Sequence, residues 1–115
     1  MTGAHDFAAQ KAETYATFAR IRDEAGTLPD TARIDYAFLP GDTPDWDAVL
    51  AALAEQGFDC ARVEPGPDDG PDGPWLEASL TDQPLSASAV WLGEEMATRT
   101  ALPFGFRPDG WGFLI

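Results

Sequence analysis

The stretch 33–63 reads RIDYAFLPGDTPDWDAVLAALAEQGFDCARV, and its hydrophobic period changes twice along the way. Over 33–39, apolar residues alternate with polar or small ones, which predicts a strand with one buried face. Over 58–63 the period is again two residues, which predicts a second strand. Between them lies a longer segment with helical spacing, so the stretch predicts a strand, a helix and a strand in that order.

The helix between these strands is predicted over 43–56. Thr43 belongs to the residue types favoured as N-cap, and Pro44 is favoured at the first helical position because its missing N–H needs no partner there. Gly57 is expected to end the helix. The apolar face of this helix is predicted to consist of Trp46, Val49, Leu50 and Leu53.

Two further elements follow in the second half of the chain. A loop at 65–74, rich in Pro, Gly and Asp, precedes a strand predicted over 75–81, which favours an antiparallel hairpin. A helix is predicted over 86–102, capped by Ser86 or Ser88. From the spacing of residues, its buried face is predicted to consist of Leu85, Ala89, Leu92 and Met96, with Thr100 as a further candidate.

The two ends of the chain complete the pattern. A leading helix with one apolar stripe is predicted over 6–25, and Gly26 is expected to end it. The tail 104–115 is predicted to form a strand, a turn at 108–110 and a closing extended piece. The element order is therefore one helix followed by β-α-β-β-α-β.

This order predicts an α+β fold of the ferredoxin-like type, a split β-α-β sandwich with four antiparallel strands and two helices on one face. The leading N-terminal helix is extra to this arrangement and is expected to pack at the open face or the edge of the sheet. Residues 1–5 are expected to be a flexible N-terminus, and 6–115 a single domain.

The composition is typical of a small acidic globular protein. The 115 residues carry 20 Asp and Glu against 7 Lys and Arg, a net charge of −13, while 44% hydrophobic residues argue against disorder. Because like charges repel, no nucleic acid and no anionic membrane is expected as a direct partner, whereas a basic protein segment would be attracted. We expect a cytoplasmic protein, since the sequence shows no leader-like segment and no apolar run of the ~20 residues that span a bilayer.

The residue pattern does not favour catalysis. His5 is the single histidine and lies near the N-terminus, so a Ser-His or Cys-His pair inside the fold is not expected. Cys60 is the single cysteine, expected to be a small buried hydrophobe without a disulfide. The acidic loop lacks the spacing of a calcium-binding loop, and the sequence has no nucleotide-binding glycine motif. We expect a protein that is not an enzyme and has no cofactor or metal.

The closing segment 104–112 reads FGFRPDGWG and resembles the closing motif of the RraB family, the protein regulators of ribonuclease E. That motif is a tyrosine followed by Asp-Gly-Trp-Gly, and Pro108 stands here in place of the tyrosine. Weaker matches follow in the family's order: the helix around 10–14, the strand 34–39 and the corner 56–59.

The resemblance covers about 10–113. It implies a ferredoxin-like fold and a non-enzymatic protein that binds ribonuclease E, chiefly outside its catalytic domain, and lowers its activity on RNA. The acidic charge, derived independently, fits docking on a basic, arginine-rich segment. A small acidic binding protein of the immunity type, directed at another basic protein, stays open as an alternative, and a hydrolase is a more distant one.

Candidate contacts with such a partner are acidic and aromatic residues, because an exposed ring on an acidic surface can receive arginine by stacking. Trp91 falls off the predicted stripe and is expected to be partly exposed, whereas Trp46 is expected in the core. Trp111 is expected chiefly to pin the last strand to the core, with an open edge for a partner. The candidate partner-binding residues are Asp68, Asp69, Asp72, Trp75, Trp91, Asp109 and Trp111.

Overall fold

The structure is a computed structural model that describes residues 5–68 and 73–113. Asp69 and Asp72 of the predicted partner contacts, and residues 1–4 of the predicted flexible N-terminus, lie outside the described residues. The elements in chain order are α1 (Phe7–Ala25), β1 (Thr31–Pro40), α2 (Trp46–Glu55), β2 (Asp59–Val63), β3 (Trp75–Pro84), α3 (Ala87–Ala101), the short 3-10 helix η1 (Leu102–Phe104) and β4 (Phe106–Phe113).

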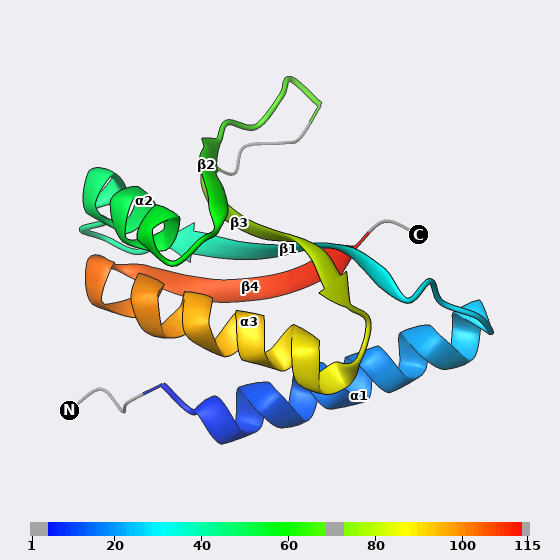
Figure 1. The fold of residues 1–115 in the computed structure, drawn as a ribbon. Helices are drawn as coiled ribbons and strands as arrows, with labels where there is room; N and C mark the ends of the chain where they lie inside the picture. Colours follow the sequence, from blue (N-terminus) through cyan, green and yellow to red (C-terminus); the bar gives the residue numbers. More distant parts are fainter. Residues whose placement is uncertain (1–4, 69–72, 114–115) are drawn as a thin grey trace.

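The four strands form one sheet in the order β2-β3-β1-β4, and every neighbouring pair is antiparallel. Helices α2 and α3 lie on one face of this sheet (Figure 1). In the described part of the chain, no helix covers the other face. The predicted ferredoxin-like arrangement is therefore confirmed, and β4 and β2 are the two edge strands.

Helix α1 lies at the edge of the sheet, one of its two predicted places, and its N-terminal half packs along α3 (Figure 1). It begins after Asp6, whose carboxylate accepts the N–H of Ala9 at 2.9 Å, and ends at Gly26, which has φ 77°. The ring of Phe18 in α1 lies 6.4 Å from that of Phe113 at the end of β4. Thus α1 is held by both α3 and the last strand.

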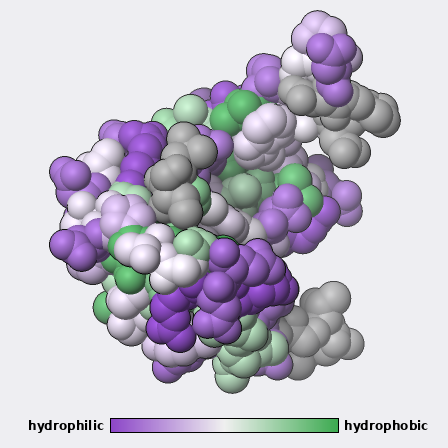
Figure 2. Space-filling view, turned by 90° about the vertical axis from the view of Figure 1, so that its right-hand side faces the viewer, coloured by the Kyte–Doolittle hydropathy of each residue, from purple (hydrophilic) through white to green (hydrophobic). Residues whose placement is uncertain are grey.

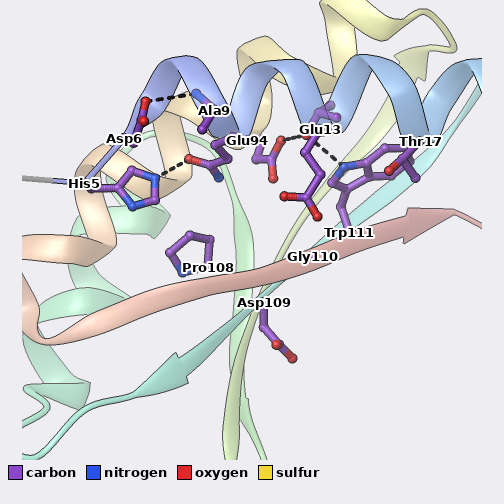
Figure 3. Close-up of a pocket in the computed structure, with 12 residues that line it drawn as sticks. His5, Asp6, Ala9, Glu13, Thr17, Glu94, Pro108, Asp109, Gly110 and Trp111 are labelled. Atoms are coloured by element: carbon purple, nitrogen blue, oxygen red, sulfur yellow. Dashed lines mark hydrogen bonds between the residues drawn. The ribbon is translucent and has the colours of Figure 1, made fainter.

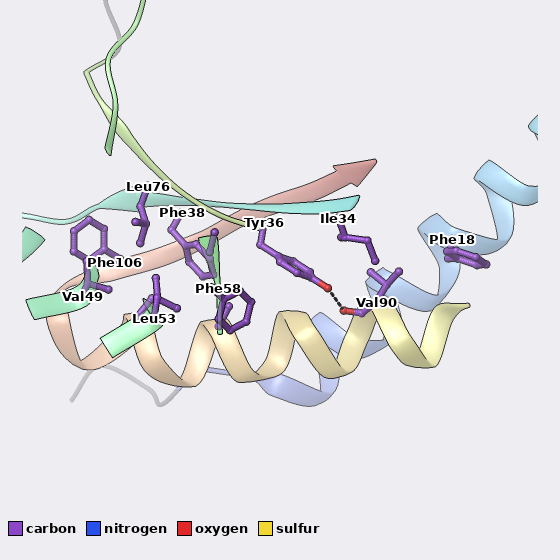
Figure 4. Close-up of a cluster of buried hydrophobic side chains, with 13 residues drawn as sticks. Phe18, Ile34, Tyr36, Phe38, Val49, Leu53, Phe58, Leu76, Val90 and Phe106 are labelled. Atoms are coloured by element: carbon purple, nitrogen blue, oxygen red, sulfur yellow. Dashed lines mark hydrogen bonds between the residues drawn. The ribbon is translucent and has the colours of Figure 1, made fainter. Parts of the chain in front are cut away.

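The core lies between the sheet and its two helices (Figure 4). Val49 and Leu53 from the predicted stripe of α2 are fully buried there, against aromatic side chains from β1 and β4. The hydroxyl of Tyr36 donates to the backbone carbonyl of Val90 at 2.9 Å, so the ring crosses the whole layer with its polar atom paired. Burial, the larger cause, and the nearby carboxylate of Glu94 both raise the pKa of the Tyr36 phenol.

The predicted start of α2 was wrong by two residues. The N-cap is Asp45, whose carboxylate accepts the N–H of Ala48 at 3.1 Å, and the helix begins at Trp46 rather than Pro44. The cause is tertiary: the N–H of Asp45 itself donates to the carbonyl of Phe104 at 2.9 Å, which holds the preceding residues outside the helix. Thr43 therefore does not cap it.

The predicted buried face of α3 was also wrong at Leu92 and Met96, whereas Leu85 packs against the core. Leu92 is 65% exposed and Met96 39% exposed, although Ser86 caps the helix as predicted. The residues that the helix buries are mostly small or polar, so the positions of the larger apolar residues do not indicate its buried face. The buried residues of α3 are Val90, Trp91, Gly93, Glu94, Ala97, Thr98 and Ala101.

The predicted turn in the tail does not form, because β4 runs without interruption through 108–110. Ala37 of β1 pairs with Gly110 and the next residue, Phe38, pairs with Pro108, so Asp109 is the extra residue of a β-bulge. A proline is tolerated here because β4 is an edge strand. Likewise β3 continues to Pro84, three residues beyond its predicted end, through a register irregularity.

Candidate acidic hollow between α1 and β4

A hollow of about 550 Å³ lies between the N-terminal half of α1 and the bulge of β4 (Figure 3). Its floor is formed by Glu94 of α3 and by Trp111 of β4, and its sides by α1 and by residues 108–110. The bulge contributes to this shape since it bends the edge strand locally. We call this site the acidic hollow.

A chain of hydrogen bonds crosses the floor. The indole N–H of Trp111 donates to the hydroxyl of Thr14 at 3.3 Å, and that hydroxyl in turn donates to the carboxylate of Glu94. Nearby, the side-chain amide of Gln10 donates to the hydroxyl of Thr98 at 3.1 Å. Side chains from β4, α1 and α3 therefore share one polar network.

Glu94 is 4% exposed, so its carboxylate has lost most of its water. Burial raises the pKa of Glu94, while hydrogen bonds from Thr14 and Gln10 oppose this shift. Glu13 adds to the rise and His5 opposes it, each through its charge. The carboxyl group of Glu94 on the floor of the hollow is thus harder to ionise than the solvated carboxyl groups at its rim.

The described lining of the acidic hollow carries four acidic residues and no Lys or Arg. Asp6 caps α1, and Glu13 extends from α1 toward β4 (Figure 3). The ring of His5 lies against that of Phe7, with centroids 4.7 Å apart, and its Nε2 is 2.6 Å from the side-chain oxygen of Gln10. The hollow is therefore suited to a cationic group.

A second hollow of about 570 Å³ lies on the open face of the sheet, at the base of the β2–β3 hairpin. Figure 2 shows the outline of the molecule indented below this projecting hairpin. Leu39, Pro74 and Trp75 give the second hollow apolar walls. Arg107 provides a positive charge there and donates to the carbonyl of Pro40 at 3.4 Å.

Asp109 lines both hollows, and its side chain extends to the side of β4 opposite α1 (Figure 3). The bulge residue therefore lies where the two hollows meet across the edge strand. Of the predicted contacts, Trp111 lines the acidic hollow and Trp75 lines the second hollow. Asp109 lies between these two hollows. Asp68 is exposed in the hairpin loop and lines neither hollow.

Trp91 was predicted to be partly exposed, and this was wrong: it is 5% exposed. It shares a helical face with Glu94 and Thr98, three and seven positions further on, whose side chains bond to α1. Helix α3 is covered by the sheet on one side and by α1 on another, so Trp91 is buried although it does not face the sheet. Trp91 is therefore removed from the candidate partner contacts.

Trp46, expected in the core, is only half-buried, and its ring stacks with an arginine of the same chain. The guanidinium of Arg62 lies 4.7 Å from the centre of its ring, and the ring of Phe106 forms a T-shaped pair with it, with centroids 4.8 Å apart. Cys60 is partly buried against the core, and its thiol donates to the carbonyl of Leu50 at 3.3 Å. Burial is the main cause that raises the pKa of this thiol.

Sequence reasoning missed Glu13, Thr14 and Glu94 as members of the site. The signal for Glu94 was its position between Val90 and Ala97 at helical spacing, where a charged residue on a packed face needs a partner. Nothing in the sequence pairs it with Thr14, because the two lie 80 positions apart. Within the described residues, no group of three or more His, Cys, Asp or Glu side chains could hold a metal ion.

A family model described as RraB, Regulator of ribonuclease activity B, matches residues 11–113. The chain belongs to the RraB family. The matched range includes Thr14, Glu94 and Trp111, the three residues of the hydrogen-bonded floor. No curated protein matches the chain.

Membership of the RraB family supports a general role as a regulator of ribonuclease E. The family is described as one of regulators, which fits the expectation that the protein is not an enzyme. Among the helices that the structure describes, none is long and apolar enough to cross a membrane.

Proposed function

We propose that this RraB-family protein binds a basic segment in the non-catalytic region of a ribonuclease E and thereby lowers the activity of the enzyme on RNA. The contact surface is the edge strand β4 with the acidic hollow on one side and the second hollow on the other. The observation that carries the proposal is the acidic hollow itself, whose described lining has four acidic residues and no Lys or Arg, with the side chain of Asp109 extending to the far side of β4.

The charge of the protein supports this partner. A net charge of −13 attracts a basic segment over several ångströms and increases the association rate, whereas RNA itself is repelled. A regulator of this kind acts by occupying a surface of the enzyme. It covers the basic region with which the enzyme holds its substrate, so inhibition follows from contact alone.

The geometry supports two different contacts across β4. The acidic hollow suits a lysine or arginine side chain, which would lie beside Glu13 and against the half-buried ring of Trp111. The second hollow has apolar walls, and Arg107 offsets the charge of Asp109 there. It therefore suits an apolar side chain of the same segment.

The first experiment is a calorimetric titration of the protein with the non-catalytic basic region of the ribonuclease E from its host. We expect saturable binding that weakens markedly from low to moderate salt, because opposite charges are screened as ionic strength rises. RNA cleavage by the whole enzyme should slow over the same range of protein concentration.

No heat at either salt concentration would contradict the proposal. If the protein then retained another basic protein from its host, the alternative of an immunity-type binding protein would replace it. Binding whose affinity does not change with salt would refute the electrostatic part of the mechanism alone.

A further inference from the structure

A third hollow, of about 640 Å³, lies between α3 and the end of β3, on the side of α3 that faces away from α1. Leu92, Met96 and Ala89 line it from the helix, and Leu80 and Pro84 line it from the strand. Leu92 and Met96 are two of the three large hydrophobic residues that are exposed in the described chain. We call this feature the α3 groove.

The α3 groove exists because the two helices on the sheet differ in length. Helix α2 has 10 residues and α3 has 15, which are about 15 and 22 Å long at 1.5 Å per residue. Gln56, at the end of α2, bonds to Thr100 near the end of α3, so α2 covers only the C-terminal part of its neighbour (Figure 1). The N-terminal half of α3 is left with an uncovered side.

From this we infer that the α3 groove binds the apolar face of a basic amphipathic helix of a partner protein. Leu92 and Met96 are four positions apart and form a ridge along α3. Another helix can pack the groove between its own rows of side chains onto such a ridge. A docked helix would continue the helical layer beyond α2 and cover the partly buried side chain of Leu80.

The charge around the groove decides between possible occupants. The charged residues that line it, among those described, are Glu95 and Arg99, which pair at 2.9 Å. The guanidinium of Arg99 also lies 4.1 Å from the ring centre of Phe7, so this cation has partners within the chain. Asp82, which precedes the groove residue Gln83 in β3, is exposed. An apolar centre with a neutral to acidic border favours an apolar helix face with basic flanks.

Other occupants of an apolar face fit these charges less well. A second copy of this chain would bring two molecules of net charge −13 together, and repulsion between like charges opposes this association. An anionic membrane surface is disfavoured for the same reason. The inference stands apart from the ribonuclease proposal, since it concerns another face of the protein and any partner with such a helix.

The test uses the full chain and a synthetic peptide of about 18 residues, built from leucine and lysine with helical apolar spacing. A scrambled peptide of the same composition and charge is the matched control for non-specific attraction. We expect the amphipathic peptide to bind roughly tenfold more tightly than the scrambled one, and the NMR signals of Leu80, Leu92 and Met96 to shift.

Leu92→Ser with Met96→Ser should remove this preference while the far-UV circular dichroism and thermal midpoint are retained, because both side chains are exposed. Tyr15→Ser, which removes the exposed aromatic side chain of α1, is the control and should keep the preference. Equal affinity for the two peptides would overturn the inference. So would a salt-insensitive dimer of the protein that dissociates in the double variant, because the groove would then join two copies.

Discussion

The indole of Trp111 and the hydroxyl of Thr14 are joined by a hydrogen bond of 3.3 Å, although the two residues lie 97 positions apart. Thr14 is 3% exposed and its hydroxyl donates a hydrogen bond to Glu94, so the bond from Trp111 ties the last strand to the first helix and, through Thr14, to α3. The Asp-Gly-Trp-Gly motif therefore has a structural role in this chain. Its tryptophan holds α1, the helix that is extra to the common ferredoxin-like fold, against the last strand.

Replacing Trp111 with Phe should lower the free energy of unfolding by about 1–2 kcal/mol. The substitution removes the N–H donor and part of the ring, which leaves the buried hydroxyl of Thr14 with one partner fewer. Urea denaturation followed by circular dichroism measures the change. Trp75→Phe is the control, since the same ring atoms are removed at the second hollow, and an equal loss in both variants would argue against the role of the hydrogen bond.

The buried carboxyl of Glu94 predicts a stability that falls as pH rises. Burial raises the pKa of Glu94 in the folded state above its ordinary value of 4.5, so the folded state holds this proton more tightly than the unfolded state does. The stabilising contribution is complete below pH 4.5 and is lost as pH rises through the folded-state pKa. Urea denaturation at a series of pH values above this point measures it.

Glu94→Gln removes that dependence and keeps an acceptor for the hydroxyl of Thr14. The stability of the variant relative to the wild type should therefore increase with pH. Glu95→Gln, the adjacent carboxyl in an exposed ion pair with Arg99, is the control and should change the dependence little. A difference between wild type and Glu94→Gln that stays constant with pH would show that Glu94 titrates normally.

Gly93→Ala should destabilise the fold by about 1–3 kcal/mol, the usual cost of overpacking a core. A Cβ atom at this position would lie 2.9 Å from Cζ of Tyr36 and closer still to its hydroxyl, which is fixed by its bond to Val90. Gly112→Ala in β4 is the control, because a Cβ there meets nothing within 4 Å. Differential scanning calorimetry should show a lower midpoint for the first variant alone.

The two candidate caps of α2 can be separated by mutation. Asp45→Ala should lower the free energy of unfolding by about 1 kcal/mol, since the N–H of Ala48 then loses its acceptor. Thr43→Ala should cost less, because the hydroxyl of Thr43 does not cap the helix. Chemical denaturation of the two variants measures both values, and the reverse order would restore the assignment that the sequence alone suggested.

The order and type of the elements could be predicted from the sequence because each has a local signal. The alternation in 33–39 and the stripe of Trp46, Val49 and Leu53 depend on neighbours within a few positions, and local spacing is what periodicity reports. The same holds for Gly26 as the end of α1. These signals were sufficient for the ferredoxin-like topology.

The predictions that were wrong depend on contacts between distant parts of the chain. The bond from Asp45 to the carbonyl of Phe104 moves the start of α2, and the packing of α1 on α3 buries Trp91. The apparent turn at 108–110 is a bulge because β1 continues to pair with β4 on both sides of it. No local pattern contains such information.

The candidate site could be predicted only in part for the same reason. Asp109 and Trp111 were identified through the resemblance of the closing segment, and Trp75 through its position at the end of the acidic loop. Glu13 and Glu94 come from two helices that meet only in the folded protein. The acidic hollow is therefore a product of the tertiary structure.

The central claim is that the acidic hollow and the bulge at its border, rather than the net charge alone, bind the basic region of ribonuclease E. Glu13→Gln with Asp109→Asn removes two charges at this site. Asp23→Asn with Glu24→Gln removes two charges from exposed positions near the opposite end of α1. The two double variants therefore have the same net charge.

Calorimetric titration of both variants with the basic region of the host's ribonuclease E is the most direct measurement. We predict that the pair at the hollow weakens binding by at least about tenfold, as expected when charged contacts inside an interface are lost, whereas the pair at Asp23 and Glu24 has an effect within about twofold. Equal affinities for the two variants would contradict the account, because binding would then follow net charge and not this site.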